Sequence, residues 1–203
     1  MAAAQASAAA IAVSPACVVN PTPAIGSPMK VTGSGFTPGD SVDFTSNKGG
    51  ASGTATADAS GNVATTMRGP ILRTMNPAAA AFVLTAKDKT DGVTTASTPF
   101  DAANLAVTTH PLEGSPSKKV TWLFSGFVSG AEIYAHYLHK GKVTATATFG
   151  RAQGPCGVLK KKAVFYPGNA KYSIYKIQVD DARHYLAGTL PRWVATLKTN
   201  LPF

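Results

Sequence analysis

Histidine and the acidic residues are the side chains of this chain best suited to metal binding or proton transfer. The histidines are His110, His136, His139 and His184. His136 and His139 lie three positions apart in a segment expected to be a strand, which sends their side chains to opposite faces and argues against a shared metal site. Serines and threonines are so numerous that a Ser-His-Asp triplet has no diagnostic value. We therefore predict no catalytic site, no metal site and no cofactor.

Lysine is the second group that could carry function, because the net charge of +9 is unevenly distributed. Residues 1–105 hold six Lys or Arg against six Asp or Glu, and residues 106–203 hold thirteen against four. The densest run is Lys160, Lys161 and Lys162, with Lys140 and Lys142 nearby in sequence. A basic face of this kind attracts polyanions such as acidic glycans, wall polymers or lipid head groups. A solubilising surface is the alternative interpretation.

Nucleic acid is not a favoured partner of this basic region. Binding of single strands usually needs aromatic side chains among the basic residues, on which the bases can stack. Tyr134, Tyr137 and Tyr166 are available by position, but the same residues can equally belong to a core. We therefore expect an anionic polymer or a surface glycan instead.

The two cysteines, Cys17 and Cys156, are far apart in the sequence. Their spacing fits neither a metal site, which wants close pairs, nor a redox C-x-x-C motif. In an oxidising compartment such a pair tends to be bonded, so a disulfide between the two halves is one hypothesis, and two separate buried thiols are the other.

The first residues, MAAAQASAAAIAV, are typical of the small-residue end of a signal peptide or of a disordered tag rich in alanine. We expect residues 1–10 to lie outside the fold. No run approaches the roughly 20 apolar residues needed to span a bilayer. The expected location is therefore outside the cell or on its surface.

A repeated stretch must position all of these side chains. The sequence KVTGSGFTPGDSVDF (30–44) returns as KVTWLFSGFVSGAEIY (119–134), and both copies carry Gly-Phe-x-x-Gly. The shared positions are Gly35, Phe36 and Gly39 in the first copy and Gly126, Phe127 and Gly130 in the second. Each copy is typical of two half-buried strands joined at a turn that needs glycine. The match predicts two related β modules in tandem.

Short segments of alternating apolar and polar residues follow in both halves, with frequent turn residues between them. Val120, Trp122 and Phe124 give three large apolar side chains on one face of a strand. We predict an all-β chain of two Ig-like antiparallel β-sandwiches, with domain 1 at residues 11–105 and domain 2 at residues 106–203. The first strand is expected over residues 11–19, and residues 180–185 are expected to form one helical turn.

The first copy resembles the bacterial Ig-like modules of secreted and cell-surface proteins, which carry G-x-G-F-x-P-G-(D/E)-x-V. The matching residues are Gly33, Gly35, Phe36, Pro38, Gly39, Asp40 and Val42. The second copy departs from this pattern at Ser129, where the proline is missing. Later segments of the second half resemble domains of exported actinobacterial proteins of unassigned function. The resemblance implies a fold and a compartment, and no specific ligand.

Two classes of function are compatible with these patterns. The first is a non-enzymatic exported protein for adhesion or assembly, whose basic second domain contacts polyanions. The alternative is a self-assembling structural subunit, such as an extracellular filament or a virion decoration protein. Such a subunit would form a homo-oligomer by pairing strand edges, or by donating the segments 1–10 and 199–203 to other copies.

Overall fold

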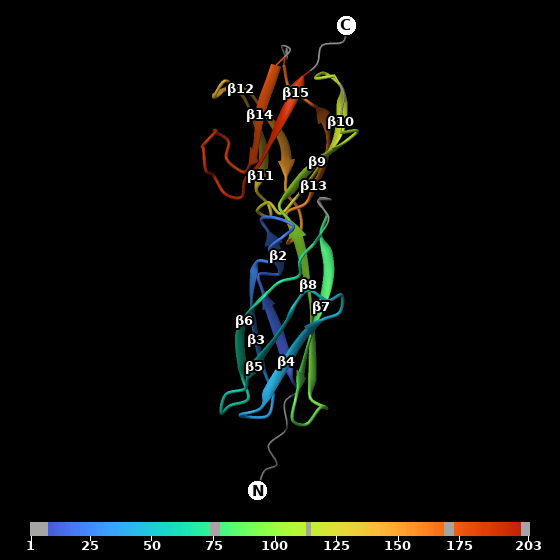
Figure 1. Ribbon diagram of the computed structural model, residues 1–203, viewed down its shortest axis with the longest axis vertical. Helices are drawn as coiled ribbons and strands as arrows, with labels where there is room; N and C mark the ends of the chain where they lie inside the picture. Colours follow the sequence, from blue (N-terminus) through green and yellow to red (C-terminus); the bar gives the residue numbers. More distant parts are fainter. Residues whose placement is uncertain (1–7, 74–77, 113–114, 169–172, 200–203) are drawn as a thin grey trace. The chain divides into compact units, whose positions relative to one another are not determined.

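The computed structural model describes residues 8–73, 78–112, 115–168 and 173–199, and every regular element within these ranges is a β-strand. The all-β prediction is therefore confirmed. Contacts divide the chain into two compact units, unit 1 (Met1–Arg73 and Ala80–Ala102) and unit 2 (Thr74–Ala79 and Ala103–Phe203). Each unit is a β-sandwich of two sheets, and every register described is antiparallel (Figure 1).

Unit 1 combines a three-stranded sheet of order β1-β3-β6 with a five-stranded sheet of order β2-β8-β7-β4-β5. The smaller sheet consists of β1 (Ala10–Ser14), β3 (Pro28–Ser34) and β6 (Val63–Arg68). The larger sheet consists of β2 (Cys17–Asn20), β4 (Ser41–Ser46), β5 (Ser52–Thr56), β7 (Ala80–Asp88) and β8 (Thr95–Asn104). The alternation of these strands places Val31, Phe44 and Leu84 in a core between the sheets.

The start of the fold differs from the prediction in two respects. Residues 11–19 were expected to form one strand, but β1 pairs with β3 in one sheet and β2 lies beside β8 in the other. Pro15 stands between β1 and β2, and because proline has no N–H for a ladder, the chain can leave one sheet there and join the other. Ala9 packs against the core and Ala10 pairs with Ser34, so the fold begins before residue 11.

Unit 2 combines a three-stranded sheet of order β13-β10-β9 with a four-stranded sheet of order β12-β11-β14-β15. The smaller sheet consists of β9 (Ala106–His110), β10 (Lys119–Ser125) and β13 (Leu159–Val164). The larger sheet consists of β11 (Glu132–His139), β12 (Lys142–Arg151), β14 (Ser173–Asp180) and β15 (Trp193–Thr199). The segment between β14 and β15 has no helical turn, which corrects the expectation for residues 180–185.

Aromatic rings dominate the core of unit 2. The ring of Phe149 lies 5.0 Å from that of Trp122 and 4.8 Å from that of Phe124, in tilted arrangements that suit the charge distribution of aromatic faces and edges. Tyr137 and Tyr166 meet edge to face at 5.1 Å and are both buried. These two tyrosines therefore belong to the core and are not available for stacking on a nucleic-acid base.

The repeated stretch has the same hydrogen bonds in both units. The amide of Gly39 donates to the carbonyl of Ala57 at 3.0 Å, and the amide of Gly130 donates to that of Ala152 at 2.9 Å. Gly35, Gly39, Gly126 and Gly130 all have φ between 78° and 82°, in the left-handed region that favours glycine. Phe36 and Phe127 are buried, one in the core of each unit. The two copies are thus one structural element used twice.

Both cysteines are disulfide-bonded, and because the chain has no others, Cys17 is bonded to Cys156. The disulfide hypothesis is therefore confirmed, and the alternative of two free buried thiols is wrong.

Candidate functional site

The lysine run occupies β13, which is an outer strand of its sheet, and all three side chains are exposed. Lys162 lies opposite Thr121, on the outer face of the sheet. Lys160 shares that face because alternate residues of a strand point the same way. Lys161 lies opposite Trp122, whose ring is in the core, so Lys161 leaves β13 on the inner side, at the open edge of the sandwich.

Lys140 and Lys142 lie at the hairpin between β11 and β12, where Lys140 has a positive φ of 48°. β12 is the outer strand of the other sheet and lies next to β13. The hydroxyl of Tyr166, just after β13, donates to Thr144 Oγ1 on β12 at 3.1 Å and links the two strands. All five predicted lysines therefore lie on or next to the two outer strands β12 and β13, along one edge of unit 2, and we call them the basic edge.

The basic edge has no acidic partners within the part of the chain that the structure describes. Among the described residues the only ion pair joins His136 to Asp180, which are fully buried and do not belong to the basic edge. Lysines on an outer strand also hinder pairing with the edge of another sheet, so the same run opposes strand-to-strand assembly at β13.

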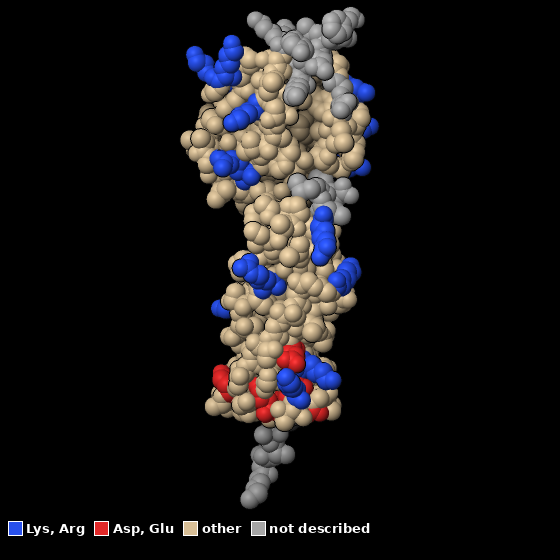
Figure 2. Space-filling model, in the orientation of Figure 1, with Lys and Arg blue, Asp and Glu red and all other residues tan. Residues whose placement is uncertain are grey.

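The two units differ in surface charge on the face shown in Figure 2. Acidic side chains gather at one end of unit 1, with Lys and Arg side chains among them, whereas the described surface of unit 2 in this view shows Lys and Arg and no Asp or Glu. The turns that carry Asp58 and Asp88 meet at one end of unit 1, because Phe36 N donates to Gly61 O at 3.2 Å and Thr37 N donates to Asp88 Oδ2 at 3.2 Å.

A second polar site lies on the outer face of the four-stranded sheet of unit 2. His136, Gln178 and Asp180 are buried there, although they point away from the sandwich core. His136 Nε2 lies 3.0 Å from the carbonyl of Ala182 and 3.4 Å from Asp180 Oδ1. His136 Nδ1 lies 3.2 Å from Thr146 Oγ1. Because Ala182 follows β14, these contacts fix the segment between β14 and β15 against the sheet.

Gln178 and Asp180 complete the attachment of residues 181–192, which we call the covering loop. The amide of Ala182 donates to Asp180 Oδ1 at 3.0 Å. Gln178 Nε2 donates to Asp180 Oδ2 at 2.5 Å and to the carbonyl of Leu186 at 2.9 Å. The loop thus buries polar groups that would otherwise be solvated, and each gains hydrogen-bond partners in exchange.

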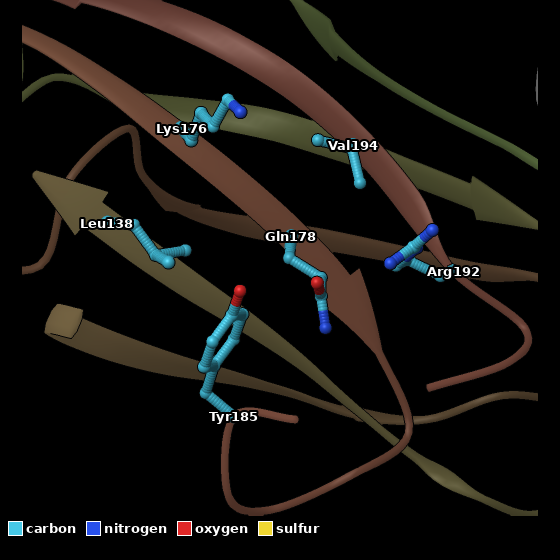
Figure 3. A pocket seen from close by; sticks show the side chains of 6 residues that line it. All are labelled: Leu138, Lys176, Gln178, Tyr185, Arg192 and Val194. Atoms are coloured by element: carbon cyan, nitrogen blue, oxygen red, sulfur yellow. The ribbon is translucent and has the colours of Figure 1, made fainter. Parts of the chain in front are cut away.

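A pocket of about 260 Å³ lies between the covering loop and the sheet. Its lining residues are Leu138, Lys176, Gln178, Tyr185, Arg192 and Val194. Figure 3 shows Tyr185 extending from the loop between Leu138 and Gln178. The ring of Tyr185 meets the ring of His136 edge to face, with centroids 5.9 Å apart, so the buried cluster also positions the pocket wall.

The sequence pointed to the five lysines as a polyanion-binding hypothesis, which stays a prediction, and gave no indication of this pocket. The sequence predicted one helical turn over residues 180–185, and the fold of the covering loop was not foreseen. The signal in the sequence was His136, an imidazole in the interior of a strand whose central residues, 133–138, are otherwise aliphatic or aromatic. His136 and His139 do lie on opposite sides: His139 packs on Tyr175 of the core at 5.3 Å. Within the described ranges no three His, Cys, Asp or Glu residues gather into a group that could hold a metal ion.

No helix in the described part of the chain is long and apolar enough to cross a membrane. No protein-family model and no curated protein matches the sequence. The resemblance to exported actinobacterial proteins therefore stays a prediction.

Several solved structures align with the chain at low similarity. A tetra-tandem repeat from the extending region of a large adhesion protein aligns over 95% of this chain and 50% of its own, at 14% identity and a TM-score of 0.30. A Ca²⁺-stabilised adhesin that helps an Antarctic bacterium reach out and bind ice aligns over 97% of this chain and 49% of its own, at 16% identity and a TM-score of 0.37. The human OSCAR ligand-binding domain aligns over 96% of this chain and 100% of its own, at 8% identity and a TM-score of 0.34.

The chain spans about half the length of the two adhesin chains. At these TM-scores the alignments carry no argument, so the description of the fold rests on the strand order and registers given above.

Proposed function

We propose that this is an exported, non-enzymatic protein of the cell surface or extracellular matrix, which contacts anionic polymers through the basic edge of unit 2. The observation that carries the proposal is the exposed run Lys160–Lys162 on an outer strand, without an acidic partner among the described residues. The disulfide between Cys17 and Cys156 supports export, because disulfides persist in oxidising compartments.

Adhesion or assembly fits these features better than catalysis does. The titratable groups that cluster in unit 2, His136 and Asp180, are fully buried and bonded to the covering loop, where they serve to hold its backbone. A general acid or base has to reach the proton that it transfers, and these two side chains are enclosed.

The experiment compares two full-length variants on a column of immobilised polygalacturonate. Lys160, Lys161 and Lys162 are replaced by glutamine in the first variant, and Lys30, Lys87 and Lys89 of unit 1 in the matched control. The first variant should elute at clearly lower salt than the parent, and the control should elute close to the parent. Retention should fall steeply as added salt shortens the screening length from about 10 Å at 0.1 M towards 3 Å at 1 M. Equal elution of both variants would refute the role of the basic edge.

A self-assembling subunit is the second candidate, and one feature favours it. β9 and β15 are outer strands of the two sheets of unit 2, and an apolar pocket of about 210 Å³ lies between them, lined by Trp122, Trp193 and Leu197 among others. Trp122 Nε1 is buried and has no hydrogen-bond partner among the residues that the structure describes. A strand from another copy could pair with β15 and fill this pocket. The tails proposed as donors lie largely outside the described residues, at 1–7 and 200–203.

Size-exclusion chromatography and electron microscopy of the purified protein test this second candidate. Filaments or shells would favour the subunit, and monomers would favour the binding protein. Thr196→Lys places a charge on the exposed edge of β15 and should abolish any assembly through that strand. Assembly that survives the substitution would exclude β15 as its contact.

A further inference from the structure

We propose that the pocket under the covering loop binds an acidic disaccharide, with one sugar seated over Gln178 and Val194 and carboxylates reaching Lys176 and Arg192. This site is separate from the basic edge, since none of its lining residues belongs to those five lysines.

The spacing of the two cations defines the length of the ligand. Val194 pairs with Gln178 across β14 and β15. Lys176 lies two residues from Gln178 on β14, and Arg192 lies two residues from Val194 just before β15, so all four side chains share the outer face. At about 3.3 Å per residue the Cα atoms of Lys176 and Arg192 lie about 7 Å from the centre along the strands, one on each side. This separation suits a disaccharide with a charge on each sugar better than a single small anion.

The charges at both ends of the pocket are uncommitted. Lys176 and Arg192 are exposed, and neither forms an ion pair with any residue that the structure describes. The planar guanidinium of Arg192 can hold a carboxylate through two parallel N–H donors, and the ammonium of Lys176 can hold a second one as a point charge.

The centre of the pocket offers the contacts that a sugar ring needs. Gln178 is 4% exposed, and its Nε2 is already bonded to Asp180 and Leu186, which leaves Oε1 as the acceptor for a sugar hydroxyl. The hydroxyl of Tyr185 can donate a hydrogen bond to a second sugar hydroxyl or accept one from it. Leu138, Val194 and the Tyr185 ring give apolar surface for the C–H face of the sugar.

The walls of the pocket are held in place before any ligand arrives. His136, Asp180 and Gln178 bond to the backbone of the covering loop at Ala182 and Leu186, on both sides of Tyr185. Sites formed in advance bind with less loss of conformational freedom. The volume of about 260 Å³ lies just below the range typical of ligand pockets, which also favours a small saccharide.

The test is a titration of the full-length protein with digalacturonic acid, in which binding is measured by isothermal titration calorimetry and by NMR. The fully methyl-esterified disaccharide is the matched control ligand, because it keeps the shape and loses both charges. We expect saturable binding of the acid with a dissociation constant on the order of 1 mM, and at least about tenfold weaker binding of the ester. Equal binding of acid and ester would overturn the assignment of a charged ligand, and no saturable binding would overturn the site.

Variants locate the binding. Arg192→Gln and Lys176→Gln should each weaken binding of the acid about tenfold, and Tyr185→Phe should weaken acid and ester alike. Arg183→Gln removes a charge from the same loop outside the pocket and should leave binding unchanged. The Lys160–Lys162 glutamine variant should also bind the disaccharide as the parent does, even where it has lost retention on the polymer column. Loss of disaccharide binding in that variant, or its persistence in Arg192→Gln, would refute the pocket.

Discussion

The ring of Tyr185, on the covering loop, stands edge to face against the ring of His136, with centroids 5.9 Å apart. The ring of Tyr134 is nearly parallel to the same imidazole, with centroids 6.5 Å apart. His136 thus joins the sheet to the loop through ring contacts as well as through hydrogen bonds. The imidazole has no exposed surface, so its contribution is structural and can be measured as stability.

Replacing His136 by alanine should lower the free energy of unfolding by about 1–3 kcal/mol. The substitution leaves the carbonyl of Ala182 without its buried partner and opens a space beside Tyr185, whereas the hydroxyl of the exposed Thr146 can bond to water instead. Chemical denaturation of the full-length protein measures the change. His184→Ala is the control, since His184 is exposed on the same loop and its loss should cost under about 0.5 kcal/mol. Equal destabilisation by the two substitutions would contradict the anchoring role.

The attachment of the covering loop to the sheet could not be predicted from the sequence, because the attachment depends on which residues pair across neighbouring strands. The register of β11 with β14 brings Gln178 opposite His136 and Asp180 opposite Tyr134, and no local pattern encodes that register. Alternation in β11 did indicate that His136 and His139 point apart. A polar residue on the outer face of a strand is ordinarily solvated, so its burial becomes visible only when the covering loop is placed.

The repeated turn gives a prediction that compares the two units directly. Gly39→Ala and Gly130→Ala should each destabilise the protein by about 1–2 kcal/mol, because both residues have positive φ while an added Cβ would meet open space. Gly61→Ala and Gly157→Ala should cost more, because their Cβ would also collide with the carbonyls of Phe36 and Phe127. Thermal unfolding of the four variants measures both effects. A cost at Gly61 no larger than at Gly39 would count against the steric part of the argument.

This turn was the part of the fold best predicted from sequence. The spacing Gly-Phe-x-x-Gly reflects a local backbone requirement, because the turn needs glycine where φ is positive. Since this motif occurs twice in the sequence, it predicts the same turn in both units. The division of residues 11–19 between two sheets was missed because apolar residues continue on both sides of Pro15. The lysines of the basic edge were predicted as one face, yet Lys161 leaves β13 on the side opposite to Lys160 and Lys162, a consequence of strand alternation.

The disulfide between Cys17 and Cys156 should contribute strongly to stability. Closing a chain segment of this length stabilises the folded state by up to about 5 kcal/mol in the chain-entropy model. A double Cys17→Ser, Cys156→Ser variant should therefore unfold at a markedly lower denaturant concentration than the parent. Mass spectrometry of the parent after alkylation should show no free thiol, and two alkylated cysteines in the native protein would contradict the bond.

The carboxylates at the ends of the unit 1 strands predict how stability depends on pH. Backbone hydrogen bonds from Asn62 and Ser60 lower the pKa of Asp58. The side chain and backbone of Thr94 and the backbone of Val93 lower the pKa of Asp91. Burial alone would raise the pKa of Asp88, but hydrogen bonds from Thr90 and Thr37 outweigh it and the pKa is lowered. All three groups are therefore more acidic in the folded chain than in the unfolded one.

The sign of the effect follows from linkage. A carboxylate whose pKa is depressed by folding stabilises the folded state fully above its unfolded pKa of about 3.9, and the contribution is lost as the pH falls through the folded pKa. The free energy of unfolding should accordingly decrease as the pH is lowered from about 5 to 2. Denaturant titrations at several pH values measure this slope. An Asp58→Asn, Asp91→Asn variant has nothing to titrate at these positions and should show a shallower slope, and an unchanged slope would show that these turns do not govern acid stability.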